Sequence, residues 1–155
     1  MPAKLDAIVT ELAGVDREER IAILVDRARG LKLWPERLEG CRDLAHRVQE
    51  CQSPVYLVAE PSGDHIALFA DAPIEAPTVR GFVALLVEGL DGATAAAIEE
   101  TPDDLIERAK MPEILGPRRL HGLHGIVRRL RAEARRAATL RSKNPIETPS
   151  RRGVE

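Results

Sequence analysis

Hydrophobic positions near the start of the chain repeat with the spacing of α-helices. Two such sets come first: Leu5, Ile8, Val9 and Leu12, then Ile21, Leu24, Val25 and Ala28. Residues three and four apart lie on one face of a helix, so each set predicts an amphipathic helix with a buried side. Asp16 with Glu19 resembles a capping box for the second helix, and Gly30 supplies its stop.

The pattern changes to alternation in the middle of the chain. Residues 55–59 and 66–70 form two alternating runs, separated by a segment that contains Pro61 and Gly63. This predicts an antiparallel hairpin with a loop of about five residues. Because a lone hairpin is marginally stable, we expect helices on one face and a third strand around residues 47–49.

Helical spacing returns after Pro77. Thr78, Thr94 and Thr101 are predicted to begin three helices, because a Thr hydroxyl can accept a hydrogen bond from a free backbone N–H. The first and last of the later helices carry apolar faces, at Val79, Phe82, Val83, Leu86 and Leu90, and, from Pro117 onward, at Leu120, Leu123, Val127, Leu130 and Ala134. The order of elements predicts an α+β fold: a small antiparallel sheet of two to three strands packed against several helices. Residues 1–141 are expected to form one domain, and residues 142–155 a disordered tail.

Composition narrows the class of protein. Of the 155 residues, 44% are hydrophobic and 31% charged, as in a folded globular domain. No apolar run approaches the roughly 20 residues that cross a bilayer, and the first residues do not resemble a signal peptide. With Cys41 and Cys51 as the two cysteines, this favours a cytoplasmic protein with free thiols and no membrane partner.

Acidic and basic residues are segregated along the second half of the chain. Residues 88–107 contain seven acids and no Lys or Arg, whereas residues 117–141 contain eight arginines and one acid, Glu133. The simplest interpretation is that these helix faces neutralise each other. The alternative is a basic docking surface for an acidic partner. Nucleic acid is not an expected partner, because the net charge is -2 and aromatic residues are 3% of the chain.

Cys51 is the strongest candidate for a reactive side chain. It stands where a polar connecting segment meets the run that starts at Val55, a junction that can hold a thiol within reach of another molecule. On the residues alone, the competing interpretation is a small buried side chain at the head of a strand.

Two sets of side chains are of the types that bind metal ions. His121 and His124 are adjacent on the final helix but have no evident third ligand. Cys41, His46 and Cys51 could offer two sulfurs and a nitrogen, at spacings wider than most structural zinc sites use. Neither set predicts a metal site, and no phosphate-binding glycine loop or serine elbow is present.

Three separated blocks carry a family resemblance. The first is Cys51-Gln52-Ser53, followed after one residue by Val55 and an aromatic side chain. The second is Phe69-Ala70-Asp71 together with Thr78-Val79-Arg80-Gly81-Phe82. The third is residues 115–123, which have the pattern Leu-x-Pro-x-Arg-x-x-Gly-Leu. In order and spacing they resemble the SufE family, the sulfur-accepting partners of cysteine desulfurases, over residues 5–135. Departures from the family pattern are Glu50, where many members have Gly, together with Pro54 and His121. A carboxylate at position 50 would raise the pKa of the thiol if it pointed at the sulfur.

The resemblance implies a SufE/IscU-like fold and a function. Cys51 would take persulfide sulfur from a pyridoxal-phosphate-dependent SufS-type cysteine desulfurase, stimulate that enzyme, and pass the sulfur to iron–sulfur scaffold proteins. Arg119 is the candidate for stabilising the thiolate or for docking. A sheltering pocket lined by Val55, Leu123 or Val127 is expected. The protein would need no cofactor or metal of its own, and would act as a transfer partner rather than as a stand-alone enzyme.

Two alternatives from other classes remain open at this point. One is a thiol peroxidase in which Cys51 reacts with peroxide and Cys41 resolves the product. The other is a non-catalytic binding module that uses the arginine-rich final helix.

Overall fold

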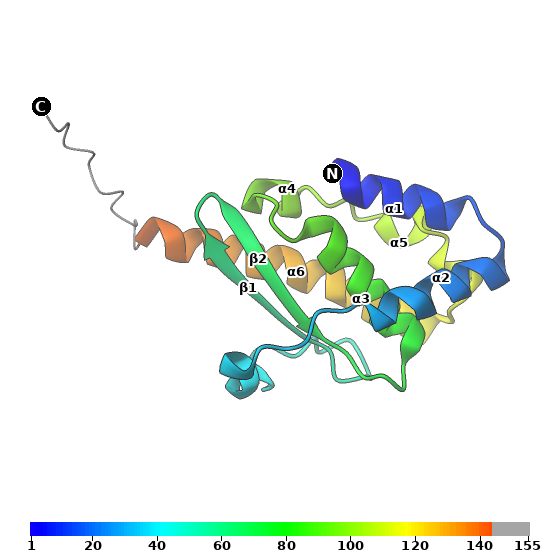
Figure 1. Ribbon diagram of the computed structural model, residues 1–155, viewed down its shortest axis with the longest axis horizontal. Coiled ribbons are helices and arrows are strands. Elements are labelled where there is room, and N and C mark those ends of the chain that lie inside the picture. Colours follow the sequence, from blue (N-terminus) through cyan, green and yellow to red (C-terminus); the bar gives the residue numbers. More distant parts are fainter. Residues whose placement is uncertain (144–155) are drawn as a thin grey trace, which may run out of the picture.

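The computed structural model describes residues 1–143 of the chain. Its elements are α1 (Ala3–Ala13), α2 (Arg17–Arg29), the 3-10 helix η1 (Glu36–Cys41), β1 (Tyr56–Ser62), β2 (His65–Asp71), α3 (Pro77–Leu90), α4 (Ala95–Glu99), α5 (Leu105–Arg108), the 3-10 helix η2 (Met111–Glu113) and α6 (Pro117–Lys143). This is the predicted α+β arrangement of a small sheet with helices (Figure 1). Because the end of α6 is rich in strong helix formers, residues 142–143 are helical rather than part of a tail. The rest of the predicted tail, residues 144–155, lies outside the described residues.

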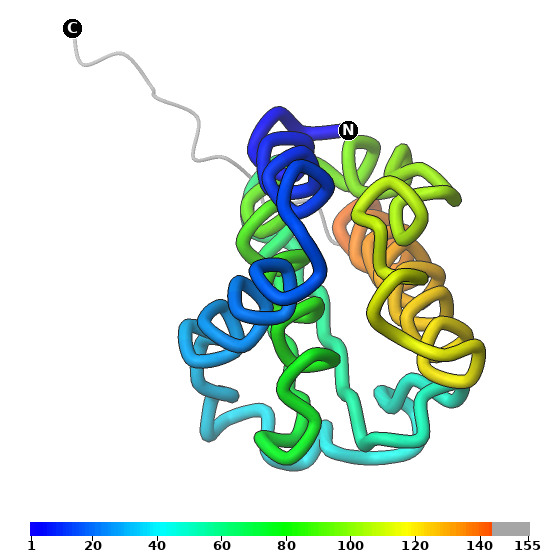
Figure 2. Tube along the Cα trace, turned by 90° about the vertical axis from the view of Figure 1, so that its right-hand side faces the viewer, coloured from blue at the N-terminus to red at the C-terminus, as the bar shows by residue number. Residues whose placement is uncertain are grey.

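Helix α3 forms the centre of the fold. Viewed end-on in Figure 2, α1 and α2 lie on one side of α3, and α6 lies on the other. The apolar face predicted for α3 is buried, with Phe82 and Val83 fully enclosed. Strand β1 packs mainly against α6, and β2 packs against α3. The two long helices therefore cover the hairpin and supply most of its buried contacts.

The hairpin is longer and its turn tighter than the sequence pattern predicts. Strands β1 and β2 pair from Tyr56 opposite Asp71 to Ser62 opposite His65, so the loop is two residues rather than five. Gly63 adopts a φ of 61° in this turn, a conformation that glycine enters without strain. Pro61 is accommodated because its partner, Ile66, directs its N–H and C=O away from β1, to residues 92–93.

The predicted third strand is reduced to a single bridge. Arg47 pairs with Tyr56 in antiparallel fashion, and the flanking bonds are Val48 N–H to Val55 O (2.9 Å) and Leu57 N–H to His46 O (3.1 Å). Among the described residues the sheet proper has two strands. Residues 49–54, which include Cys51, thus connect two segments that are hydrogen-bonded to each other.

The helix starts agree with the sequence in part. Asp16 accepts a hydrogen bond from Glu19 N–H at 2.9 Å, and Thr94 likewise caps α4, both as predicted. Thr78 is not a cap, because α3 already begins at Pro77, a residue suited to the first helical position. Thr101 is not a cap either. Its hydroxyl donates to Ile98 O, in the preceding helix α4, at 2.7 Å. The next helix, α5, begins only at Leu105.

The segregated charges of the second half neutralise each other. Arg131 on α6 pairs with Asp103 at 2.6 Å, and Arg135 pairs with Glu99 at 2.7 Å. These contacts join the acidic segment to the arginine-rich helix, which is the simpler of the two interpretations of the charge pattern. Much of α6 therefore does not present the free basic surface that a binding module would use.

Candidate functional site

Cys51 lies in the connection of residues 49–54, which packs beside the first turns of α6 (Figure 2). The Cys51 N–H donates to Val48 O at 3.3 Å, so the thiol is placed directly after the bridge that holds residue 47 to β1. Only 7% of Cys51 is exposed. The loop is thus anchored at both ends, and its thiol is turned toward the protein.

Two glycines on α6 make room for this loop. A Cβ atom on Gly122 would lie 3.1 Å from Cys51 Sγ, and one on Gly125 would lie 2.7 Å from the Cβ of Glu50. Any larger side chain at either position would push the loop away from the helix. Sequence reasoning missed this role. The available signal was a pair of glycines three residues apart inside a long helix, where each costs about 1 kcal/mol relative to Ala.

A small cavity of about 70 Å³ opens onto the thiol. Its lining residues are Cys51, Gln52, Ser53, Val79, Arg118, Arg119 and Gly122. The lining residues expected from the sequence were wrong. Val55, Leu123 and Val127 are buried in the hydrophobic core and do not line the cavity. The cavity instead lies between the Cys51 loop and residues of α3 and α6 that include Arg118 and Arg119.

Burial raises the pKa of the Cys51 thiol above its ordinary value. Three groups oppose this effect by lowering the pKa: the Ser53 N–H that hydrogen-bonds the sulfur, the charge of Arg47 and, more weakly, the charge of Arg119. The net direction is still upward, so the resting thiol is held protonated. Docking or loop movement that reduces burial would therefore favour the reactive thiolate.

The sequence places Arg119 near the thiol but overlooks Arg47. Arg119 lines the cavity, where its Nη1 donates to Thr78 Oγ1 at 3.4 Å, so the first turns of α3 and α6 meet there. Arg47 donates from Nη2 to Gln52 O at 3.4 Å and has the larger effect on the thiol pKa. Its contribution depends on the bridge to β1, which folds residue 47 back beside the Cys51 loop.

The carboxylate of Glu50 is engaged by α6. Its Oε1 lies 3.6 Å from Arg128 Nη2, and its side chain rests over Gly125. Glu50 raises the pKa of Cys51, but less than burial does and less than Arg47 lowers it. The main effect of having Glu rather than Gly at position 50 is therefore on the contact between the Cys51 loop and α6.

The other candidate residues are not brought together with Cys51. Cys41 ends η1 and does not line the thiol cavity, and both cysteines are free. His46 Nδ1 contacts Asp43 Oδ1 at 2.7 Å, and His124 pairs with Glu107. In residues 1–143, no three His, Cys, Asp or Glu side chains are grouped as metal ligands.

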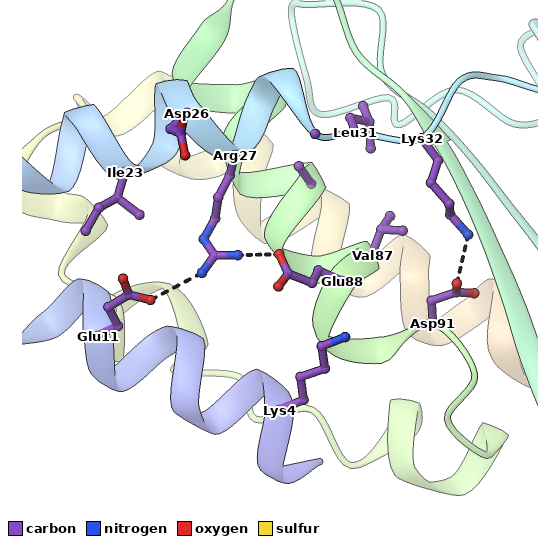
Figure 3. A pocket seen from close by; sticks show the side chains of 12 residues that line it. Lys4, Glu11, Ile23, Asp26, Arg27, Leu31, Lys32, Val87, Glu88 and Asp91 are labelled. Atoms are coloured by element: carbon purple, nitrogen blue, oxygen red, sulfur yellow. Dashed lines mark hydrogen bonds and ion pairs between the residues drawn. The ribbon is translucent and has the colours of Figure 1, made fainter.

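A separate groove of about 570 Å³ lies between α1, α2 and α3 (Figure 3). Its charged side chains largely neutralise each other: Arg27 bridges Glu11 and Glu88, and Lys32 pairs with Asp91 at 2.8 Å. No Cys, Ser, Thr or His side chain lines it. These ion pairs tie three helices together, and the Cys51 cavity remains the better candidate for chemistry.

A comparison with known protein families gives a match that includes the Cys51 loop and α6. The SufE family model, described as an Fe-S metabolism associated domain, matches residues 6–134. The chain belongs to the SufE family. The match spans the elements from α1 to most of α6 and includes the Cys51 loop. Membership associates this protein with iron–sulfur metabolism.

Relatives and a solved structure agree with the SufE assignment. The chain is 33% identical to an uncharacterized SufE-like protein of Mycobacterium tuberculosis, over 88% of this chain and 95% of that one. It is 35% identical to a SufE-like protein of Synechocystis, over 68% and 64% of the two chains. A solution structure of a hypothetical protein from Thermus thermophilus matches with a TM-score of 0.78 at 33% identity, covering 90% of this chain and 98% of that one. No helix in the described part of the chain is long and apolar enough to cross a membrane.

Proposed function

We propose that this SufE-family protein is a cytoplasmic sulfur acceptor. Cys51 receives persulfide sulfur from a pyridoxal-phosphate-dependent SufS-type cysteine desulfurase, and the sulfur then passes to an iron–sulfur scaffold protein. The observation that carries the proposal is the position of Cys51, a thiol at the wall of a cavity that also contains Arg118 and Arg119. That arrangement coincides with two of the sequence blocks that resemble the family.

The transfer is a thiol exchange at sulfur. The Cys51 thiolate attacks the outer sulfur of the donor persulfide, the donor's S–S bond breaks, and its inner sulfur leaves as a thiolate. Cys51 then carries the transferred sulfur as a persulfide anion. The charges of Arg119 and Arg47, which lower the thiol pKa, favour an anion at the same position.

Burial sets a condition on the encounter. With 7% of Cys51 exposed and a cavity of about 70 Å³, a protein-bound persulfide reaches the sulfur only if residues 49–54 shift or the donor's own loop enters. The same burial shelters the loaded sulfur from reductants in the free protein. Stimulation of the desulfurase follows if removal of its persulfide limits turnover.

The proposal is tested by alanine formation from a SufS-type desulfurase and cysteine. We expect stimulation by the wild type and by Cys41→Ser, and none by Cys51→Ser. Equal stimulation by Cys51→Ser would contradict the proposal and favour a non-catalytic binding role. If Cys51 instead served as a peroxidatic thiol, the wild type would consume hydrogen peroxide and Cys41→Ser would lose that turnover.

A further inference from the structure

The arginines at the Cys51 cavity differ from most others on α6. Five arginines of that helix have a carboxylate within 4 Å: Arg128, Arg129, Arg131, Arg135 and Arg141. Arg118 and Arg119, which line the cavity, have no such partner within residues 1–143. No acidic side chain lines the cavity. The helix therefore leaves the two arginines that line the cavity without a carboxylate partner, while most of its other arginines are paired.

The size of the cavity limits what this charge can bind. Pockets for organic ligands and cofactors measure about 300–1,000 Å³, whereas this one measures about 70 Å³. A cavity of this size has room for a few water molecules or for a compact ion of a few heavy atoms. A small, doubly charged anion fits both the volume and the two arginines that line the cavity.

We propose that the cavity binds thiosulfate and that Cys51 takes the outer sulfur of this ion directly. The inference rests on the proposed role of Cys51 as a sulfur acceptor and adds a second class of donor, an inorganic sulfane-sulfur anion. Guanidinium groups suit the oxygens of such an anion, because their fixed N–H groups donate in pairs. Arg118 and Arg119 then hold the sulfonate end, and the outer sulfur faces Cys51 Sγ.

The reaction balances without any further reagent. The thiol of Cys51 gives up its proton and its sulfur attacks the outer sulfur of thiosulfate. The S–S bond of thiosulfate breaks, and its electron pair leaves with the sulfonate end as sulfite, which takes up the proton. One thiol and one thiosulfate thus yield a Cys51 persulfide anion and hydrogen sulfite, with no net oxidation.

The test uses the full chain and thiosulfate at constant ionic strength. We expect release of sulfite and the addition of one sulfur atom to Cys51 by intact mass, with neither seen in Cys51→Ser. Replacing both Arg118 and Arg119 with Gln should slow sulfite release at least tenfold. Arg136→Gln is the matched control, because Arg136 is an exposed arginine of the same helix that does not line the cavity.

A second reagent separates anion binding from general thiol reactivity. Methyl methanethiosulfonate is uncharged and also reacts with thiolates, so its rate reports the ionisation and exposure of Cys51. We expect the ratio of the thiosulfate rate to this rate to fall at least tenfold in the double variant. An unchanged ratio, or no sulfite from the wild type, would overturn the inference. If the desulfurase still loads Cys51 in that case, the sulfur-acceptor function stands and only the inorganic donor is excluded.

Discussion

Gly122 of α6 faces the thiol of Cys51. A Cβ atom at this position would come within 3.1 Å of the sulfur and 3.4 Å of the Cys51 Cα. The absence of a side chain at Gly122 thus creates the space in which the sulfur lies. This contact ties the reactivity of Cys51 to the fit between one loop and one helix face.

Gly122→Ala is expected to displace the Cys51 loop. The added methyl group would lie 3.1 Å from Cys51 Sγ, so the loop must move by a few tenths of an ångström. We expect this shift to leave the thiol less buried, with a lower pKa. We therefore expect Cys51 to react several-fold faster with iodoacetamide, as measured by peptide mass mapping. Gly116→Ala is the control, because a Cβ there meets nothing within 4 Å. Equal labelling rates in wild type and Gly122→Ala would show that the loop is not held in this way.

Glu50 and Gly125 are expected to be energetically coupled. Gly125→Ala places a methyl group 2.7 Å from the Cβ of Glu50, and overpacking of this kind costs about 1–3 kcal/mol. In a Glu50→Gly background the obstructing atoms are gone, so the same substitution should cost much less. Urea unfolding of the four proteins gives the coupling energy, for which we expect about 1 kcal/mol or more. Strict additivity would contradict the contact.

Because the pKa of Cys51 is raised in the folded protein, the free energy of unfolding should decrease as the pH becomes alkaline. The folded protein keeps the thiol proton to a higher pH than the unfolded chain does. The contribution is complete below the ordinary thiol pKa of about 8.5, and it is lost as the pH rises through that value toward the raised one. We expect the stability of the wild type relative to Cys51→Ser to decline over this window in urea unfolding. A relative stability that rises with pH would mean that the pKa is lowered instead.

Arg20 is expected to be the most sensitive charged residue of the fold. It is 1% exposed, and its guanidinium donates to Leu12 O at 2.8 Å, to Val15 O at 2.6 Å and to Glu113 at 3.0 Å. Because hydrogen bonds to charged groups contribute about 1.5–3 kcal/mol each, Arg20→Met should lower the unfolding free energy by about 3 kcal/mol or more. Lys has no planar fork, so Arg20→Lys should recover little of this loss. A loss below about 1 kcal/mol would contradict this assignment.

The sequence predicted the helices and the hairpin because their buried faces leave a local periodic signal. The observed boundaries differ from the predicted ones where a residue has two possible roles. Pro61 resembles a loop residue, but it fits in β1 because Ile66 pairs on its other side. Thr101 resembles an N-cap, but its hydroxyl bonds backward to Ile98 O.

The candidate site was predictable only where residues carry their own chemistry. Cys51 and Arg119 stood out because of the thiol and the family resemblance. Arg47, Gly122 and Gly125 did not, because their roles exist only once the loop of residues 49–54 has docked on α6. Burial and docking are tertiary effects, so their influence on the thiol pKa has no local signature.

The central claim is that Cys51 carries transferable sulfur, and one mass measurement tests it directly. The protein is incubated with a SufS-type desulfurase and cysteine, alkylated and mapped by peptide mass. We predict one additional sulfur atom on the Cys51 peptide in the wild type and in Cys41→Ser, and none in Cys51→Ser. Sulfur found on Cys41, or on neither cysteine while the desulfurase turns over, would contradict the account.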